Sequence, residues 1–160
     1  MTVTDLDFEN HLILVNHQLL RNTELGYYIE TPKTKSSERQ VPMVEVTCQA
    51  LKRVLAVQNQ NECVEIDGYS NFLFLNRNGY PKTACDFNSI LRNLIKKYNK
   101  CHEEKLPHIT PHTLRHTFCT NCANAGMNPK ALQYIMGHAN ITMTLNYIMH
   151  MRPVIRLWRK

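Results

Sequence analysis

Long apolar stretches are absent from this 160-residue sequence. A helix needs about 20 consecutive apolar residues to cross a bilayer, and no such run occurs. The opening segment, MTVTDLDFEN, is acidic, whereas a secretory signal begins with a basic segment followed by an apolar one. We therefore expect a soluble, cytoplasmic protein that has no membrane partner.

A regular cysteine framework is also missing. The six cysteines are scattered along the chain, which favours reduced thiols over disulfides. Cys119 and Cys122 form a C-x-x-C pair, but no second pair lies at the distance that a zinc ribbon requires. Because free cysteines are commonly buried, we interpret both as small buried residues of one helix and expect no metal site.

Positive charge exceeds negative charge. The sequence has 19 Lys and Arg residues against 13 Asp and Glu, which gives a formal charge of +6 and an isoelectric point near 9.1. This balance favours an anionic partner, and nucleic acid rather than a membrane surface. Many soluble domains are mildly basic, however, so charge alone does not decide the function. The length suits one compact domain, which we expect over residues 1–160.

The N-terminal part has the pattern of a small β-sheet. Three short segments rich in branched and aromatic residues, 11–18, 26–32 and 39–43, are separated by polar turn-forming residues. They predict a three-stranded antiparallel meander. From Val44 the apolar period becomes helical. The sequence thus predicts an α+β fold, mainly helical, with the sheet of residues 1–43 packed on a helical part that continues to the end of the chain.

Start and stop signals divide the helical part. A helix is predicted from Val44 and another over 82–104, which has an apolar face and a basic outer face. Three more helices are expected over 112–126, 128–138 and 142–150. The signals at their ends are the capping residues Thr110 and Asn128, the first-turn prolines Pro111 and Pro129, and Gly126 as a stop.

Four residues in the region of the last three helices are candidates for a chemical role. His112 and Arg115 are three residues apart near a helix N-terminus, so they lie on one face and could form an anion site. Taken alone, this H-x-x-R spacing is typical of structural surface pairs. His138 follows Gly137 at the end of a helix, where a lone histidine would be a capping group. Tyr147 alone would be a core or hydrogen-bonded surface residue.

Taken together in their order along the chain, however, these motifs resemble those of a known protein family. The segment TPHTLRHTFCTNCANAGMNPKALQYIMGHANITMTLNYIMH resembles the C-terminal catalytic segment of the tyrosine recombinases, which include phage and transposon integrases. IETPKTKSSERQVPM resembles the family's hairpin, whose turn carries a catalytic lysine. The resemblance is strongest to integrases of conjugative transposons and prophages of Gram-positive bacteria. It implies the DNA breaking-rejoining enzyme fold and a DNA-associated protein of the bacterial cytoplasm that recombines double-stranded DNA as a tetramer.

The resemblance also implies roles for individual residues. Tyr147 would attack the phosphodiester and form a 3′-phosphotyrosyl link. Arg115 would hold the phosphate in two-pronged fashion, while His112 and His138 would donate hydrogen bonds to its oxygens or handle protons. These cations take the place of a metal, so no metal and no cofactor are expected, in keeping with the absence of a carboxylate cluster.

Lysines complete the expected site. Lys33 matches the family lysine that protonates the leaving oxygen, and Lys35 is close enough in sequence to compete for that role. A solvated hairpin lysine is the alternative for either. As DNA-binding residues we nominate Lys35, Arg92, Lys96 and Lys97, although charged helix faces are most often simply solvated.

The sequence departs from the family in one respect. The family uses a second active-site arginine, in an upstream G-x-R-x-x-E helix, and this chain has no such motif. MTVTDLDFEN resembles the segment that directly follows that helix. We therefore expect a truncated catalytic domain that lacks this arginine and the core-binding domain, and that recombines DNA weakly or not at all. Its uncovered apolar surface would be exposed, or filled by the tail around Trp158 or by a second copy.

Two other functions share these features. A non-catalytic DNA-binding remnant would use the same basic residues without reaction of Tyr147. A type IB topoisomerase would share the chemistry, but the short chain and the spacing within MGHANITMTLNY disfavour it.

Overall fold

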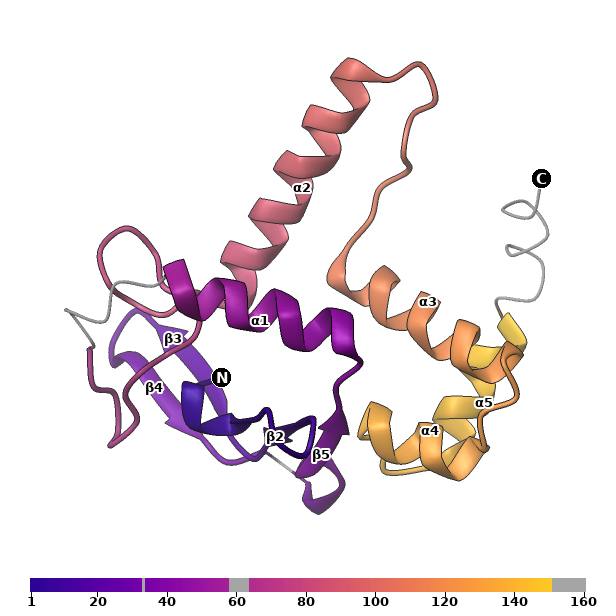
Figure 1. Ribbon diagram of the computed structural model, residues 1–160, viewed down its shortest axis with the longest axis horizontal. Coiled ribbons are helices and arrows are strands. Elements are labelled where there is room, and N and C mark those ends of the chain that lie inside the picture. The colour runs from indigo at the N-terminus through magenta and orange to yellow at the C-terminus, as the bar shows by residue number, and fades with distance from the viewer. Residues whose placement is uncertain (33, 58–63, 151–160) are drawn as a thin grey trace. The chain divides into compact units, whose positions relative to one another are not determined.

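The computed structural model describes residues 1–32, 34–57 and 64–150, without the side chains of Lys35 and of residues 147–150 (Figure 1). The chain divides into two compact units, Met1–Thr83 and Ala84–Lys160. The described elements of the first unit are a 3-10 helix η1 (Val3–Asp5), strands β1 (Leu6–Asp7), β2 (Leu12–Val15), β3 (Gln18–Asn22) and β4 (Gly26–Glu30), a 3-10 helix η2 (Lys35–Ser37), strand β5 (Arg39–Pro42) and helix α1 (Glu45–Val57).

Two antiparallel sheets form in the first unit. One has the strand order β1-β2-β5, with Ile13 of β2 opposite both Leu6 and Val41. The other is the β3–β4 hairpin, in which Leu20 lies opposite Tyr28. The hairpin occupies the chain between β2 and β5, the two strands that pair in the first sheet.

The predicted meander is therefore wrong in its pairing. The segments 11–18, 26–32 and 39–43 contain β2, β4 and β5, but β4 pairs with β3 instead of with either of the other two. The physical reason is the turn at Asn22, whose side-chain oxygen accepts hydrogen bonds from the N–H groups of Glu24 and Leu25. This turn folds β4 back onto the residues just before it, and so excludes it from the sheet.

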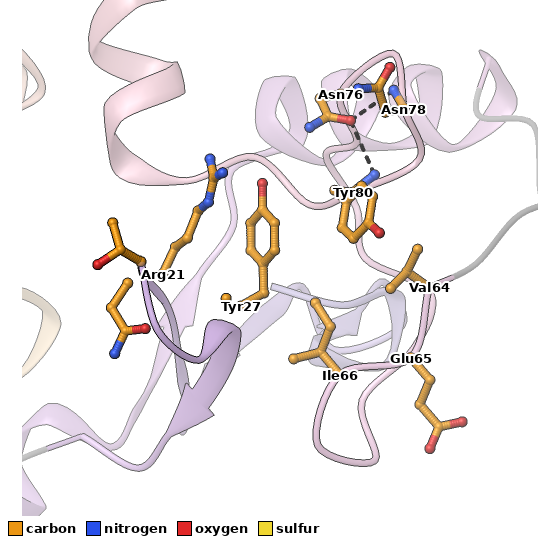
Figure 2. Close-up of a pocket in the computed structure, with 11 residues that line it drawn as sticks. Arg21, Tyr27, Val64, Glu65, Ile66, Asn76, Asn78 and Tyr80 are labelled. Carbon is orange, nitrogen blue, oxygen red and sulfur yellow. Dashed lines mark hydrogen bonds between the residues drawn. The ribbon is translucent and has the colours of Figure 1, made fainter.

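The hairpin is held against the loop that precedes the second unit. Arg21 lies over the ring of Tyr27 at 5.1 Å from the ring centroid, and Tyr27 stacks on Tyr80 with centroids 5.3 Å apart. Tyr27 lies between the other two side chains (Figure 2). All three line a hollow of about 920 Å³. In addition, the Asp67 carboxylate accepts a hydrogen bond of 2.7 Å from the main-chain N–H of Ile29 in β4.

Helix α1 covers the main core of the first unit. Its residues Cys48 and Leu51 are buried one turn apart, together with Leu6, Met43 and Leu73 from the sheet and loop. The apolar face predicted from Val44 is therefore only partly correct. The valines near both helix ends are exposed, namely Val44, Val46 and Val57.

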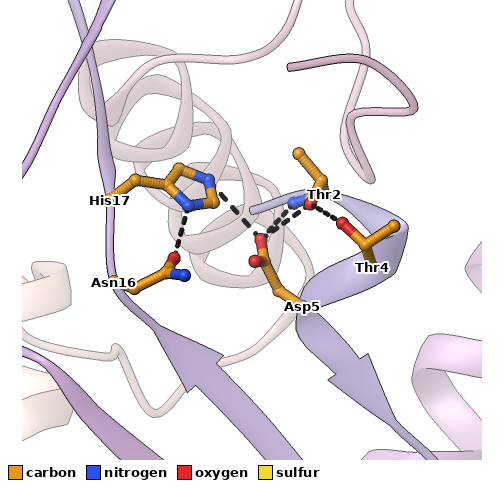
Figure 3. Close-up of polar contacts among 5 residues, drawn as sticks. All are labelled: Thr2, Thr4, Asp5, Asn16 and His17. Atoms are coloured by element: carbon orange, nitrogen blue, oxygen red, sulfur yellow. Dashed lines mark hydrogen bonds and ion pairs between the residues drawn. The ribbon is translucent and has the colours of Figure 1, made fainter. Parts of the chain in front are cut away.

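A buried polar contact lies at the start of this unit. The side chains of Asp5 and His17 are 6% and 3% exposed, and the His17 Nε2 atom lies 3.5 Å from an Asp5 carboxylate oxygen (Figure 3). The same oxygen accepts hydrogen bonds from the main-chain N–H and the hydroxyl of Thr2. Burial lowers the pKa of His17, although the charge of Asp5 acts in the opposite direction.

The described part of the second unit is helical. Its elements are α2 (Ala84–Cys101), α3 (Pro111–Asn124), α4 (Pro129–Met136) and α5 (Ile141–His150). Helices α3, α4 and α5 pack against one another around Cys119, Leu132 and Met136. These helices agree with the predicted ones to within a few residues at each end.

Helix α2 differs from the others in its packing. It has the predicted apolar face, but none of its residues is buried. The exposed large side chains on this face are Phe87, Ile90, Leu94 and Tyr98. Within the described residues, no helix is long and apolar enough to cross a membrane.

Candidate active site

A predicted capping residue sets the start of α3, and a glycine sets the turn after α4. Thr110 is the N-cap of α3, where its hydroxyl accepts a hydrogen bond from the N–H of Thr113. The hydroxyl of Thr113 in turn accepts a hydrogen bond from the N–H of Thr110. Helix α4 ends at Gly137, whose φ of 66° lies in the left-handed region that glycine adopts without strain. Both boundaries follow from local chemistry, and they fix the positions of the motif residues that come next to them.

His112 and Arg115 occupy the first turns of α3. His112 is exposed, whereas Arg115 is half-buried. The Arg115 Nη2 atom donates a hydrogen bond to the main-chain carbonyl of Met136, the last residue of α4. This bond brings the guanidinium to the end of α4, two residues before His138. The structure thus places two of the predicted motifs, separated by more than 20 residues, at one location.

His138 is fixed on both its main chain and its side chain. Its N–H donates to the carbonyl of Gln133, and the Gln133 side chain donates back to the His138 carbonyl at 3.0 Å. The ring is buried, at 6% exposure for the residue, and its Nδ1 atom lies 2.9 Å from the hydroxyl of Thr144 in α5. Thr144 itself has no exposed surface.

Tyr147 belongs to α5, three residues after Thr144. Residues with this spacing lie on the same face of a helix, so the backbone of α5 carries Tyr147 on the face that bonds to His138. The side chain of Tyr147 lies outside the described atoms. Thr144 was missed by the sequence reasoning, although its helical spacing from Tyr147 was a usable signal.

His116 is a neighbour of this group. Its ring lies edge-on to that of His112, with centroids 5.0 Å apart. Burial lowers the pKa of His116, and the nearby charges of His112 and Arg115 lower it further. The neutral form is therefore favoured.

The predicted lysines are less well defined. Lys33 lies outside the described residues. Lys35 begins η2, and only its backbone is described. The segment around it is held by hydrogen bonds among the hydroxyls of Thr34, Ser36 and Ser37.

The nominated basic residues Arg92, Lys96 and Lys97 are exposed on α2. Arg92 also lines a hollow of about 290 Å³ with Ser89 of the same helix and His108 of the segment before α3. Sequence reasoning did not single out Ser89 or His108, because neither belongs to a motif or a charged run. Among the described residues, no group of three His, Cys, Asp or Glu side chains could hold a metal ion.

Comparison with protein families decides the classification. The family model for phage integrases matches residues 1–152. The chain belongs to the phage integrase family. Tyrosine recombinases are among the relatives of the chain, which confirms the recognition made from the motifs.

Relatives in this family are longer than the chain. The transposase from transposon Tn916 of Enterococcus faecalis is 72% identical over 150 residues, which cover 94% of this chain and 37% of that protein. The tyrosine recombinase XerC of Bacillus subtilis is 30% identical over 119 residues, which cover 74% of this chain and 38% of that protein. The chain thus spans about two fifths of the length of these relatives.

Solved structures show the same fold. The Tn1549 transposon integrase in complex with circular intermediate DNA matches with a TM-score of 0.86 and 62% identity, over 92% of this chain and 48% of that one. The XerA recombinase matches with a TM-score of 0.64 over 100% of this chain and 51% of that one, and its 23% identity makes this a likeness of fold alone. The predicted α+β fold of the recombinase catalytic domain is confirmed.

Proposed function

We propose that this integrase-family chain cleaves and rejoins DNA strands by transesterification, as the catalytic part of a site-specific recombinase. The observation that carries the proposal is the bond from Arg115 to the Met136 carbonyl. It joins the H-x-x-R helix to the end of α4, where His138 bonds to the helix that carries Tyr147. Three motifs of the family thereby lie within one packed set of helices, α3, α4 and α5.

The proposed chemistry exchanges one phosphate ester for another. The Tyr147 oxygen loses its proton and forms a bond to phosphorus, while the bond from phosphorus to the 5′ oxygen breaks and this oxygen gains a proton. The product is a 3′-phosphotyrosyl link, so the ester is conserved and no nucleotide hydrolysis is needed. The reverse attack by a 5′ hydroxyl rejoins the strand.

The remaining residues would bind the phosphate oxygens and transfer protons during the reaction. Arg115 offers N–H groups in a planar fork that matches two phosphate oxygens. His112, which is exposed on the first turn of α3, and His138 would donate further hydrogen bonds or transfer protons. Lys33 or Lys35 would protonate the leaving oxygen. That the family's other arginine lies outside these 160 residues stays a prediction.

DNA is the proposed partner. A related integrase that is 62% identical was solved in complex with DNA, and the positive charge of this chain suits a phosphate backbone. Arg92, Lys96 and Lys97 would contact that backbone from the exposed side of α2. Cooperation with other protomers, as a tetramer on two DNA sites, is part of the same proposal.

A nicked suicide substrate tests the proposal. Cleavage beside a nick releases a short strand, so rejoining is prevented and even a slow covalent adduct accumulates. We expect an adduct between the chain and DNA that is absent in Tyr147→Phe. DNA binding without any adduct would instead support the non-catalytic remnant, and an adduct that persists in Tyr147→Phe would refute Tyr147 as the nucleophile.

A further inference from the structure

We propose that Thr144 is a positioning residue of the active site, whose hydroxyl selects the tautomer of His138. This inference rests on the proposed function, because it concerns the hydrogen that His138 would offer to the DNA phosphate. Thr144 would act through His138 and would not touch the DNA.

The contact between the two side chains is buried at both ends. The Thr144 oxygen lies 2.9 Å from the Nδ1 atom of His138, Thr144 is 0% exposed, and His138 is 6% exposed. Within the described part of the chain, Nδ1 is the one hydrogen-bond partner that the Thr144 hydroxyl has. Water therefore does not compete for this bond.

The direction of the bond follows from this isolation. A hydroxyl has one hydrogen, and a buried hydroxyl that leaves its hydrogen without an acceptor carries a desolvation penalty. If Nδ1 held a hydrogen, the Thr144 hydroxyl could only accept, and its own hydrogen would have no acceptor. The favoured arrangement has the Thr144 hydroxyl donating to a bare Nδ1. The hydrogen of neutral His138 is then on Nε2.

This tautomer has a consequence for catalysis. A neutral imidazole donates a hydrogen bond through only one of its nitrogens. With Nδ1 engaged by Thr144, His138 keeps its donor at Nε2, on the opposite side of the ring. A preorganised donor needs no rearrangement when negative charge develops on the phosphate, and this is how such groups accelerate reactions. The bonds of Gln133 to the N–H and the carbonyl of His138 fix the main chain that carries the same side chain.

The bond also links His138 to the nucleophile's helix. Thr144 precedes Tyr147 by three residues in α5, so both belong to one helix face. A shift of α5 relative to the end of α4 would break the contact between Thr144 and His138. The hydroxyl thereby couples the position of the donor to that of the helix that carries Tyr147.

Nuclear magnetic resonance of the ring nitrogens tests the tautomer directly. In the full chain labelled with ¹⁵N-histidine, the shifts of His138, assigned by their loss in His138→Gln, should show a protonated Nε2 and a bare Nδ1 at neutral pH. Thr144→Val has the same shape without the hydroxyl and should change this distribution, while Thr144→Ser should keep it. A protonated Nδ1 in the wild type would overturn the inference without need of any variant.

Cleavage of the suicide substrate tests the consequence. Thr144→Val should form the covalent adduct on the order of 10- to 100-fold more slowly at unchanged DNA affinity, because small misplacements of a catalytic group cost this much. Thr144→Ser should restore the rate. Thr142→Val removes an exposed hydroxyl from the same helix and is the matched control, with no expected change.

The two proposals fail in different ways. A Thr144→Val rate equal to the wild-type rate would refute the positioning role and leave Tyr147 chemistry intact. Absence of any adduct in the wild type would refute the proposed function, and the nitrogen shifts would still decide the tautomer.

Discussion

The guanidinium of Arg115 donates a hydrogen bond to the main-chain carbonyl of Met136 and thereby joins two helices of the second unit. A guanidinium carries several N–H donors in a fixed plane. One arm can therefore hold the end of α4 while the others bind phosphate oxygens. The same side chain serves the fold and the proposed chemistry.

Replacement of Arg115 by lysine should weaken both the bond to the end of α4 and the binding of phosphate oxygens. An ammonium keeps the charge but lacks the planar fork, so it cannot bond to the Met136 carbonyl and to two phosphate oxygens together. We expect adduct formation to fall by about 100-fold or more, a typical effect of losing one such donor. Single-turnover cleavage of the suicide substrate measures this loss. An Arg115→Lys rate within a few-fold of the wild type would contradict the two-pronged role.

The left-handed Gly137 gives a second prediction. Alanine at this position would be strained by about 1 to 2 kcal/mol, because its Cβ meets the following carbonyl. Gly126, which follows α3 with φ of 83° and has open space where a Cβ would lie, is the matched control. Urea unfolding should show similar losses for Gly137→Ala and Gly126→Ala.

Only Gly137 directly precedes a motif residue, which is His138. Adduct formation should therefore fall further in Gly137→Ala than in Gly126→Ala. Asparagine tolerates the left-handed region better than alanine, and Gly137→Asn should recover part of the loss. Equal cleavage rates for the two alanine variants would show that the backbone at Gly137 does not matter to His138.

The buried His17 should make the free energy of unfolding depend on pH. Burial lowers the pKa of His17 in the folded state, so the unfolded chain binds a proton in a range where the folded chain does not. The unfolding free energy should therefore fall as pH drops through the unfolded value of about 6.5, and rise as pH increases through it. His17→Gln should flatten this slope in urea unfolding between about pH 5 and pH 7.

His108→Gln is the control for this experiment, because it removes an exposed histidine and leaves the buried His17 in place. An unchanged slope in His17→Gln would show that the pH dependence arises elsewhere in the chain.

Local chemistry made much of the second unit predictable. Thr110, Gly126 and Asn128 act within one helical turn of their own positions, and each lies at a helix boundary as expected. The motif spacing then indicated the family, which the comparison confirmed. Helix boundaries that depend on such local effects can be predicted from a single sequence.

Non-local pairing was not predictable in the same way. Strand β1 has two residues, too few for any periodicity, and the residues of β3 were assigned to the end of one strand and to a turn. The bond from Arg115 to Met136 crosses 21 positions, and that from His138 to Thr144 depends on how two helices pack. The roles of Tyr147, Arg115, His112, His138 and the lysines stay predictions until the experiments above are done.

Helix α4 lies between the left-handed glycines Gly126 and Gly137 and is eight residues long. Each residue added to an α-helix turns its end by about 100° and moves it by about 1.5 Å. One inserted or deleted residue in α4 would therefore rotate Met136 and His138 away from Arg115, whatever side chain it carried. The segment between the two glycines should therefore tolerate substitutions only at its exposed positions, and a change of its length nowhere.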